Sequence, residues 1–373
     1  MKIKVKKNGI LDVLAKIQGI TGRKSNLSIT ENVLIKTSGS EIKIQATDLE
    51  TGFEGFYPAT VINNGIVALN SRKLFEIIKN YPNEDINIEE DENRRVKIGG
   101  KKINYNIPGR DYEDFPDIPI IEDIDFFTIE SSELKRMIEQ TIMINAGVDE
   151  KRAHILGVLF ECIENNESFM VQMVSTDGKR LARSHFQYNK KEKGVTPGKK
   201  VLIPKKGLSE IIKFLESEDH VQLGVKDNNF VVNKDKETMI LNILEGSFPE
   251  FEKILSFDNE NVLSFNKNDL KMLVRRMSIL TSGDYKGVFF NFNKNSLVVT
   301  TANPDLGESR EIMDIEFNKD PFKVAFNPQF FIDTLNFIES DTILMNIKDE
   351  ENPCLIKGEK EDSFLSVVMP MKI

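Results

Sequence analysis

The residues best suited to chemistry are carboxylates that follow short apolar segments. Residues 47–50 read Thr-Asp-Leu-Glu and residues 176–180 read Thr-Asp-Gly-Lys-Arg, so both place acids directly after a predicted strand. Carboxylates at such positions could bind a metal ion and support hydrolysis. Residues 301–305, Thr-Ala-Asn-Pro-Asp, lie at the matching point later in the chain. The same pattern at three corresponding points of the chain is more typical of a turn built by an Asp or Asn side chain than of a metal site. We therefore predict turns at all three points. A metal-dependent hydrolase using Asp48 or Asp177 is kept as an alternative.

Other catalytic signatures are absent from the sequence. It contains no phosphate-binding loop, no Gly-x-Gly-x-x-Gly after a strand and no Gly-x-Ser-x-Gly elbow. Cys162 and Cys354 each lie in an apolar strand pattern, which predicts small buried hydrophobic side chains rather than a disulfide. None of the three histidines is spaced as one of a pair of metal ligands. We therefore predict no enzyme activity, no metal and no cofactor.

Length and composition describe a multidomain globular protein. The 373 residues fit two or three domains, with 40% hydrophobic and 29% charged residues. Apolar runs are too short to span a membrane, and the N-terminus alternates like a strand, so we expect a cytoplasmic protein with no membrane partner. The net charge of −9 argues against tight, broad binding of nucleic acid.

The elements that position these residues come from an internal repeat. Residues 5–14, 129–138 and 265–274 each pass from an apolar strand end through a polar turn, with Asn or Ser at the N-cap, into a helix. The apolar stripes of these helices are in register: Ile10/Val13/Leu14, Leu134/Met137/Ile138 and Leu270/Leu273/Val274.

A second set of strand-to-helix entries follows each of the first. It lies at residues 70–78, 204–212 and 327–335, and each member is followed by alternating strands. Leu134 comes 124 residues after Ile10, and Leu270 comes 136 residues after Leu134, so each repeat is as long as a domain. We predict three α+β domains at residues 1–122, 126–256 and 260–373, with sheets on one side and helices on the other.

Positive charge gathers at the helix entries although the chain is acidic. Lys6, Lys7, Lys135, Arg136, Lys271, Arg275 and Arg276 belong to this set. If the domains close into a ring with helices inside, this charge meets phosphates without reading bases, and weak, salt-sensitive contacts permit sliding. The alternative is a set of ordinary solvated helix faces. The predicted DNA-binding residues are Arg23, Lys24, Arg72, Lys73, Lys151, Arg152, Lys205 and Lys206.

These motifs together identify a family resemblance. Over its full length the chain resembles the bacterial DNA polymerase III beta subunit, the DNA sliding clamp. The matches include residues 47–50, 176–182 (Thr-Asp-Gly-Lys-Arg-Leu-Ala), 203–207 (Ile-Pro-Lys-Lys-Gly) and 246–249 (Gly-Ser-Phe-Pro). The chain ends Met-Pro-Met-Lys-Ile where the family usually has Met-Pro-Met-Arg-Leu.

The resemblance implies a ring and a set of partners. Two three-domain subunits would join head to tail as a homodimer and encircle double-stranded DNA with six domains, helices lining the hole and sheets outside. A clamp loader would open the ring. The DNA polymerase III alpha subunit and other proteins with a clamp-binding motif would dock through a short apolar peptide. The function implied is that of a processivity factor in DNA replication.

The resemblance also implies one well-defined site, a groove for partner peptides. An apolar chain end rich in methionine suits such a groove, because flexible Met side chains adapt to several partners. The family often has His at Lys179 and Arg at Lys253, so partner preference could differ here. The groove residues carried over by position are Ile155, Thr176, Gly178, Lys179, Arg180, Leu181, Pro249, Lys253, Ile254, Phe330, Cys354, Val367, Met369, Pro370 and Met371.

The joint of the ring is expected between a strand of the first domain and a strand of the third. Ile103 and Tyr105 would pack against Ile279 and Leu280. Basic residues around 94–102 would face acidic residues of the third domain that include Glu308. A paralogue with the same ring and altered partners, for example one conferring resistance to a clamp-binding compound, is the other alternative.

Overall fold

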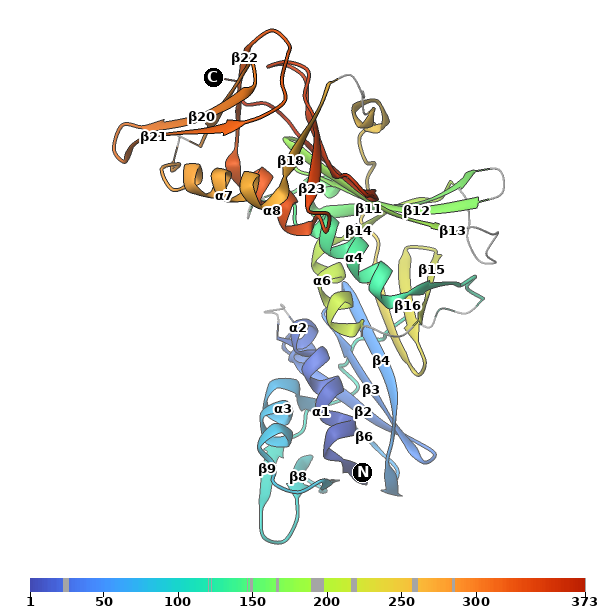
Figure 1. Ribbon diagram of the computed structural model, residues 1–373. Helices are drawn as coiled ribbons and strands as arrows, with labels where there is room; N and C mark the ends of the chain where they lie inside the picture. Colours follow the sequence, from blue (N-terminus) through green and yellow to red (C-terminus); the bar gives the residue numbers. More distant parts are fainter. Residues whose placement is uncertain are drawn as a thin grey trace. The chain divides into compact units, whose positions relative to one another are not determined.

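The computed structural model describes residues 1–22, 27–119, 121, 123–145, 147, 150–165, 168–188, 198–215, 220–256, 261–283 and 286–372. The chain divides into two compact units (Figure 1). The N-terminal unit contains mainly residues 1–135 and 203–243, and the C-terminal unit contains mainly residues 136–191 and 244–373. No helix among the described residues is long and apolar enough to cross a membrane.

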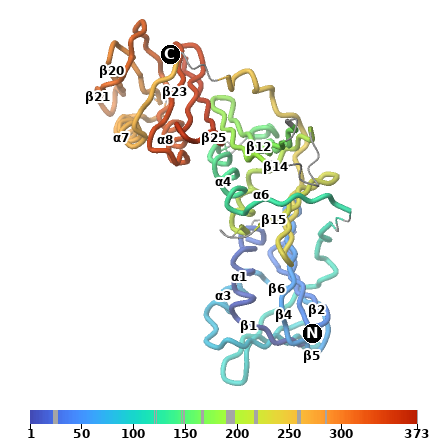
Figure 2. The backbone as a smooth tube through the Cα atoms, turned by 45° about the vertical axis from the view of Figure 1, so that its right-hand side comes forward, coloured from blue at the N-terminus to red at the C-terminus, as the bar shows by residue number. Residues whose placement is uncertain are grey.

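The N-terminal unit contains two antiparallel sheets with helices packed on them. One sheet has the strand order β5-β1-β7-β8-β9 and the other has the order β10-β15-β16-β17-β4-β3-β2-β6. Helices α1 and α3 lie side by side (Figures 1 and 2). The elements are β1 Lys2–Lys6, α1 Lys7–Lys16, α2 Gln18–Thr21, the 3-10 helix η1 Ser28–Glu31, β2 Asn32–Ser38, β3 Glu41–Thr47, β4 Thr51–Pro58, β5 Thr60–Asn63, β6 Ile66–Asn70, α3 Ser71–Asn80, β7 Asp85–Glu90, β8 Arg95–Gly99, β9 Asn104–Pro108, β10 Phe127–Glu130, α6 Lys205–Phe214, β15 His220–Lys226, β16 Asn229–Lys234 and β17 Glu237–Asn242.

The C-terminal unit repeats this plan. An eight-stranded sheet has the order β14-β11-β12-β13-β25-β24-β23-β18, and a four-stranded sheet has the order β21-β20-β19-β22. Helix α4, Ser131–Ile142, begins before the division between the units and ends after it. The remaining elements are α5 Ala153–Leu156, β11 Gly157–Asn165, β12 Ser168–Thr176, β13 Arg180–Tyr188, β14 Lys200–Pro204, the 3-10 helix η2 Glu252–Leu255, β18 Val262–Asn266, α7 Lys267–Ser278, β19 Val288–Asn293, β20 Ser296–Asn303, β21 Gly307–Asp314, β22 Phe322–Phe326, α8 Pro328–Phe337, β23 Thr342–Asn346, β24 Cys354–Gly358 and β25 Glu361–Val368.

Strand pairing across the repeats explains why contacts group the chain into two units although the sequence repeat is threefold. In the N-terminal unit β17 pairs with β4, with Met239 opposite Phe53. In the C-terminal unit β13 pairs with β25, with Leu181 opposite Val367. Each eight-stranded sheet thus joins strands from two neighbouring repeats. The predicted boundaries near residues 122 and 257 lie partly outside the described residues.

The helical stripes predicted from periodicity form the core. All nine side chains at Ile10, Leu134, Leu270 and their register partners are no more than 1% exposed. Apolar residues at helical spacing therefore mark the buried face correctly in each repeat.

The predicted N-caps are only partly correct. Asn266 caps α7, because its side chain accepts hydrogen bonds from the backbone N–H groups of Asn268 and Asp269. Helix α1 instead begins after Lys6, which makes no side-chain cap bond, so the polar turn around Asn8 is already helical. Helix α4 includes Ser131, whose buried hydroxyl has no partner within the described part of the chain. A favourable cap residue does not fix the first helical residue when the preceding strand runs straight into the helix.

Candidate functional site

The three turns predicted from Asp and Asn are present with the same geometry. In each, one side-chain oxygen accepts hydrogen bonds from the backbone N–H groups two and three residues further on: Asp48 from Glu50 (3.1 Å) and Thr51 (2.7 Å), Asp177 from Lys179 (2.9 Å) and Arg180 (3.0 Å), and Asn303 from Asp305 (2.9 Å) and Leu306 (3.2 Å). These bonds give the acids a structural role. The described residues hold no group of three His, Cys, Asp or Glu side chains placed to bind a metal ion.

Both cysteines are free and buried, as predicted. Burial, with a smaller contribution from Glu161, raises the pKa of the Cys162 thiol to about 12. Burial alone raises the pKa of the Cys354 thiol. Both thiols are therefore protonated near neutral pH and act as apolar side chains.

The C-terminal tail is held in the sheet and then crosses to another strand. Strand β25 lies between β13 and β24, with Val368 opposite both Arg180 and Cys354. Beyond β25, the N–H of Met369 donates to the carbonyl of Lys179 at 2.9 Å, and the N–H of Met371 donates to the carbonyl of Ala325 at 2.8 Å. The tail is thus positioned by main-chain bonds, which leaves its methionine side chains available to line a groove.

Arg180, which lies opposite Val368, is a buried charged residue with several partners. It is 8% exposed, and its Nη1 lies 2.6 Å from an Asp333 carboxylate oxygen on α8. Its Nε lies 3.1 Å from Asp177, and its guanidinium carbon lies 4.4 Å from the centroid of the Phe330 ring. Two carboxylates and an aromatic face compensate the buried cation. Asp333 was missed from sequence, because its position on α8 reveals no link to a turn so far away in the chain.

The predicted groove residues separate into surface and floor. Gly178, Lys179, Pro249, Lys253, Ile254 and Met369 are exposed, and Phe330, Pro370 and Met371 are half-buried. Ile155, Thr176, Arg180, Leu181, Cys354 and Val367 are buried. Cys354 is fully buried and supports the tail from beneath, so a bound peptide would not touch it in this conformation.

Aromatic residues around the Gly-Ser-Phe-Pro motif extend this surface. Phe248 and Phe251 pack edge to face at 5.6 Å between ring centroids. They line a cavity of about 230 Å³ together with Leu159, Lys200 and Pro249. Leu159 and Phe251 also belong to the apolar cluster that contains Leu181 and Val367, so this cavity and the tail share one floor. The motif pointed to this loop, but the sequence did not show that Phe251 would be buried.

The predicted DNA-binding residues that the structure describes are mostly at the surface. Arg72, Lys73, Lys151, Arg152 and Lys206 are exposed, and Lys205 is half-buried. Arg23 and Lys24 lie outside the described residues.

Several of these cations already have acidic neighbours. Arg72 and Lys73 both pair with Glu76 on α3, and Lys206 lies 3.1 Å from Glu50. Arg152 pairs with Glu150 at 2.8 Å, and that hydrogen bond lowers the pKa of Glu150 to about 2. Such exposed pairs are weak, so a phosphate can compete for the cation.

Two other basic helix residues are held by neighbouring side chains: Arg136 is half-buried and Arg276 is exposed. Arg136 donates hydrogen bonds to Gln140, Ser184, Ser363 and the carbonyl of His185. It therefore ties α4 to β13 and to the β24–β25 hairpin, and these contacts already use the guanidinium that we expected at a DNA-facing surface. Arg276 likewise pairs with Glu311 of β21, 2.9 Å between Nε and Oε2.

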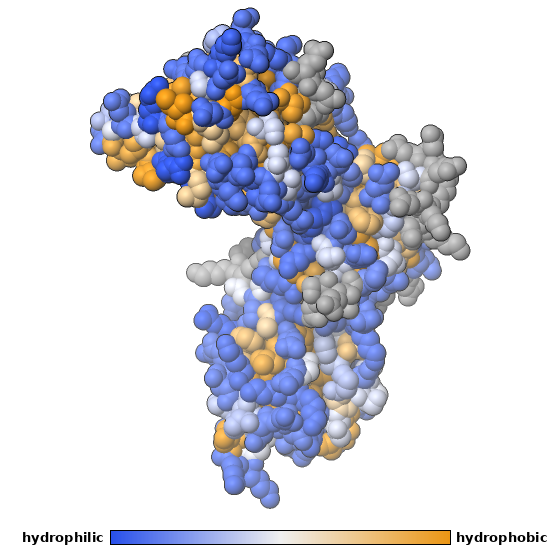
Figure 3. Space-filling model, in the orientation of Figure 1, coloured by the Kyte–Doolittle hydropathy of each residue, from blue (hydrophilic) through white to orange (hydrophobic). Residues whose placement is uncertain are grey.

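Of the predicted dimer residues, Tyr105 and Glu308 lie on edge strands and Ile103 directly precedes one, whereas Ile279 and Leu280 follow the end of helix α7. Strand β9 is at one edge of the five-stranded sheet, and β21 is at one edge of the four-stranded sheet. Ile103 and Tyr105 are 41% and 39% exposed, Ile279 is 74% exposed, Leu280 is half-buried and Glu308 is exposed. Hydrophobic atoms are visible where Figure 1 places the β20–β21 hairpin (Figure 3).

Repeated α+β domains, sheets shared between neighbouring repeats and an apolar C-terminal tail define the class of DNA clamp proteins. Models of the DNA polymerase III beta subunit match nearly the whole chain: the N-terminal domain at residues 1–119, the central domain at 128–250 and the C-terminal domain at 252–372. The chain belongs to the DNA polymerase III beta subunit family and consists of three tandem clamp domains.

Individual relatives agree in length as well as in sequence. A beta sliding clamp from Escherichia coli K12 is 26% identical over 377 residues, and one from Chlamydia pneumoniae is 26% identical over 375 residues. Both matches cover all of this chain and at least 99% of the relative. A crystal structure of a DNA polymerase III beta subunit from Eubacterium rectale has a TM-score of 0.91 and 28% identity, with full coverage of both chains. A sliding clamp structure from Bacillus subtilis, at 20% identity, has the same fold with a TM-score of 0.91.

Proposed function

We propose that this chain is the processivity factor of DNA polymerase III, a sliding clamp that encircles duplex DNA as a head-to-tail homodimer. The family assignment over nearly the whole chain carries this proposal. In this role the protein tethers and does not catalyse. We expect the protein to act in the cytoplasm, where bacterial DNA is replicated.

Contact with DNA would be electrostatic and mobile. Arg72, Lys73, Lys151, Arg152 and Lys206 are exposed and lie at or just before helix starts, where they could meet phosphates on any sequence. Their acidic neighbours keep each contact weak. Weak, salt-sensitive contacts hold the DNA in a ring without stopping movement along it.

Partner proteins would bind the surface around the C-terminal tail. The exposed groove residues form its rim, and the floor consists of Leu181, Val367 and the Arg180–Asp333 pair. An apolar peptide would bury its side chains against this floor and against Met369 and Met371. The DNA polymerase III alpha subunit and the clamp loader are the partners expected there.

The ring would close through β9 of one subunit and β21 of the other. Both are edge strands, and pairing them would remove two exposed edges at once. Ile103 and Tyr105 would then cover Ile279 and Leu280, with Glu308 near the basic residues that flank β8. The domain limits 1–122, 126–256 and 260–373 are proposed with this ring.

Retention on circular DNA tests the proposal. The protein, loaded by its clamp loader onto nicked circular DNA, is expected to remain bound through gel filtration and to be lost once the DNA is cut by a restriction enzyme. Equal retention on circular and linear DNA would contradict topological binding.

Removal of residues 369–373 tests the partner site and should abolish binding of the polymerase while the dimer persists. Loss of the dimer instead would show that the tail is not the partner site.

A further inference from the structure

Strand β22 offers an edge that the proposed ring does not use. It pairs with β19 on one side, and no other described strand pairs with it. The carbonyl of Ala325 accepts the N–H of Met371 at 2.8 Å, so the polar backbone groups of Ala325 point away from β19. The backbone N–H and C=O groups of successive residues in a strand point to opposite sides. Lys323 lies two residues before Ala325, so its backbone groups point to the same side as those of Ala325. The N–H and C=O of Lys323 therefore face the free side of the sheet.

A cavity of about 690 Å³ runs along this edge. Its lining consists of Lys323, Val324, Ala325, Glu350, Glu351 and residues 369–372. Three of those tail residues, Met369, Pro370 and Met371, belong to the proposed peptide groove. The edge and the groove therefore adjoin.

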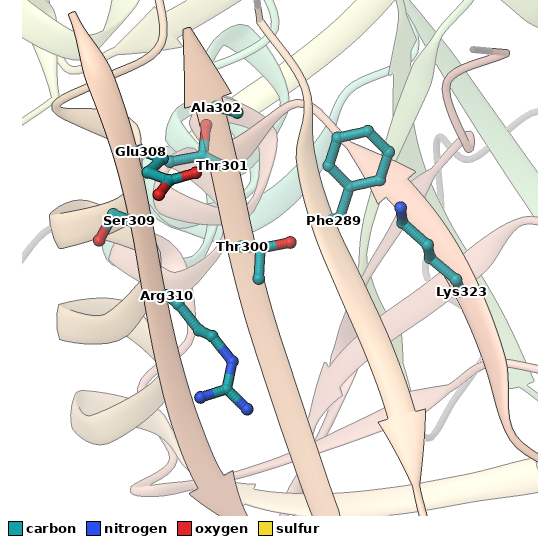
Figure 4. Close-up of a pocket in the computed structure, with 8 residues that line it drawn as sticks. All are labelled: Phe289, Thr300, Thr301, Ala302, Glu308, Ser309, Arg310 and Lys323. Atoms are coloured by element: carbon teal, nitrogen blue, oxygen red, sulfur yellow. The ribbon is translucent and has the colours of Figure 1, made fainter.

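The lysine side chain on this edge strand does not lie where it would block pairing with another strand. A Lys side chain on an exposed edge normally discourages another strand from pairing. The Nζ of Lys323 instead lies 4.0 Å from the centroid of the Phe289 ring (Figure 4). Phe289, Thr300 and Arg310 line the outer face of the sheet beside it, so the charge is held over that face.

We propose that the free edge of β22 binds an extended segment of a clamp-binding protein by β-strand addition, and that a Lys or Arg of this segment pairs with Glu350 or Glu351. The inference rests on the proposed function, because the segment would be continuous with the peptide held at the tail. The tail itself already uses this mode of binding with its one main-chain bond to Ala325. Main-chain bonds supply affinity in strand addition, and side chains supply specificity.

Charge favours a partner over a second copy of the chain. Glu350 and Glu351 are both exposed in the lining of the cavity, which also contains Lys372 of the tail and Lys323, whose Nζ is held against Phe289. A symmetric pairing of two β22 edges would bring the acidic loops of both copies to one joint, where like charges repel. A basic segment meets no such penalty.

A pair of variants at one position tests the backbone contact. Lys323→Pro removes the outward N–H, and proline is tolerated on an edge strand where that N–H faces away from the ladder. Lys323→Ala removes the cation and keeps the N–H. Affinity is measured for two probes: the intact DNA polymerase III alpha subunit of the same organism, and a short peptide with only its apolar clamp-binding motif. We expect Lys323→Pro to lower the affinity for the intact subunit about tenfold and Lys323→Ala to lower it about twofold or less. The short peptide should bind both variants with the affinity of the wild type.

The outcomes separate this inference from the proposed function. If the short peptide does not bind the wild type, the proposed groove is wrong. If it binds and Lys323→Pro leaves the affinity for the intact subunit unchanged, strand addition is wrong.

A double variant, Glu350→Ala with Glu351→Ala, leaves the strand intact and should lower the affinity for the intact subunit at least threefold at low salt. No change there would overturn the basic pairing, and a solution mass that rises with protein concentration only when β22 is intact would assign the edge to a second copy.

Discussion

At the scale of single residues, the proposed partner site depends on how the charge of one buried cation is compensated. Arg180 is 8% exposed and is matched by Asp177, Asp333 and the Phe330 ring. A buried charge is costly when a partner is removed, because the remaining charge keeps its desolvation penalty. These ion pairs connect the β12–β13 turn to α8, so we expect them to affect both stability and the shape of the proposed groove.

Asp333→Ala should lower the free energy of unfolding by about 2 kcal/mol, since it removes a hydrogen bond between charged groups at a largely buried site. It should also weaken binding of the motif peptide, because Arg180 and Phe330 lose their fixed positions. Urea denaturation and titration of the peptide measure the two effects. Asp362→Ala is the control: Asp362 pairs with Lys357 on an exposed surface, and its loss should cost under about 1 kcal/mol. Equal effects of the two variants would contradict a special role for Asp333.

His185 predicts a dependence of stability on pH. Burial, assisted by Arg183 and Arg136, lowers the pKa of His185 from 6.5 to about 4. The unfolded chain then binds a proton that the folded protein does not, so its contribution to stability is complete above pH 6.5 and falls as the pH drops toward 4. We expect a loss of about 1–2 kcal/mol over this range, after allowance for partial exposure. His185→Gln should reduce the slope measured by denaturation at several pH values; an unchanged slope would assign it to other groups.

At the scale of elements, the three repeats use different devices to start equivalent helices. Asn266 caps α7 with two hydrogen bonds, and Asn70 and Asn327 cap α3 and α8 with one each. Helix α1 has no side-chain cap. What the copies share is the buried stripe, because tertiary packing stabilises a helix more than its cap does.

Asn266→Ala should therefore destabilise the protein by about 1 kcal/mol, the usual cost of removing an N-cap. Asn8→Ala is the matched control, because Asn8 lies at the corresponding polar turn but is exposed and inside α1. Its replacement should change stability by less than about 0.5 kcal/mol. Thermal unfolding followed by circular dichroism compares the two, and a larger loss for Asn8→Ala would contradict the cap assignment.

At the scale of the whole molecule, the central property is assembly. The chain mass is 42.5 kDa, and the ring requires twice that. The exposed apolar residues at the proposed joint come from edge strand β9 and from the end of α7, and burying them would provide the driving force for association.

Ile279→Asp places a charge at the most exposed of these side chains and should convert the dimer to a monomer. Because Ile279 is 74% exposed in the single chain, the fold should be preserved. Analytical ultracentrifugation gives the mass, and circular dichroism checks the fold. Ile62→Asp, on edge strand β5 and 53% exposed, is the control and should remain dimeric. Dimerisation of Ile279→Asp with unchanged affinity would contradict the proposed joint.

The sequence alone determined the threefold repeat, the buried stripes and the Asp and Asn turns. Each depends on residues close together in the chain: helical spacing shows which face is buried, and a side chain that bonds to backbone two residues away needs no distant partner. The family motifs are likewise short runs of residues that are neighbours in the chain.

Only the tertiary structure decided which distant residues meet. The sequence placed Arg136 with the DNA-facing cations, whereas packing against Ser184 and Ser363 gives it a structural role. Asp333 joins the proposed site through its ion pair with Arg180, and the hydrogen bond from Met371 to Ala325 brings the tail to the edge of β22. Strand pairing and burial of charge join segments far apart in the chain. Their free energy depends on three-dimensional neighbours, which local patterns do not specify.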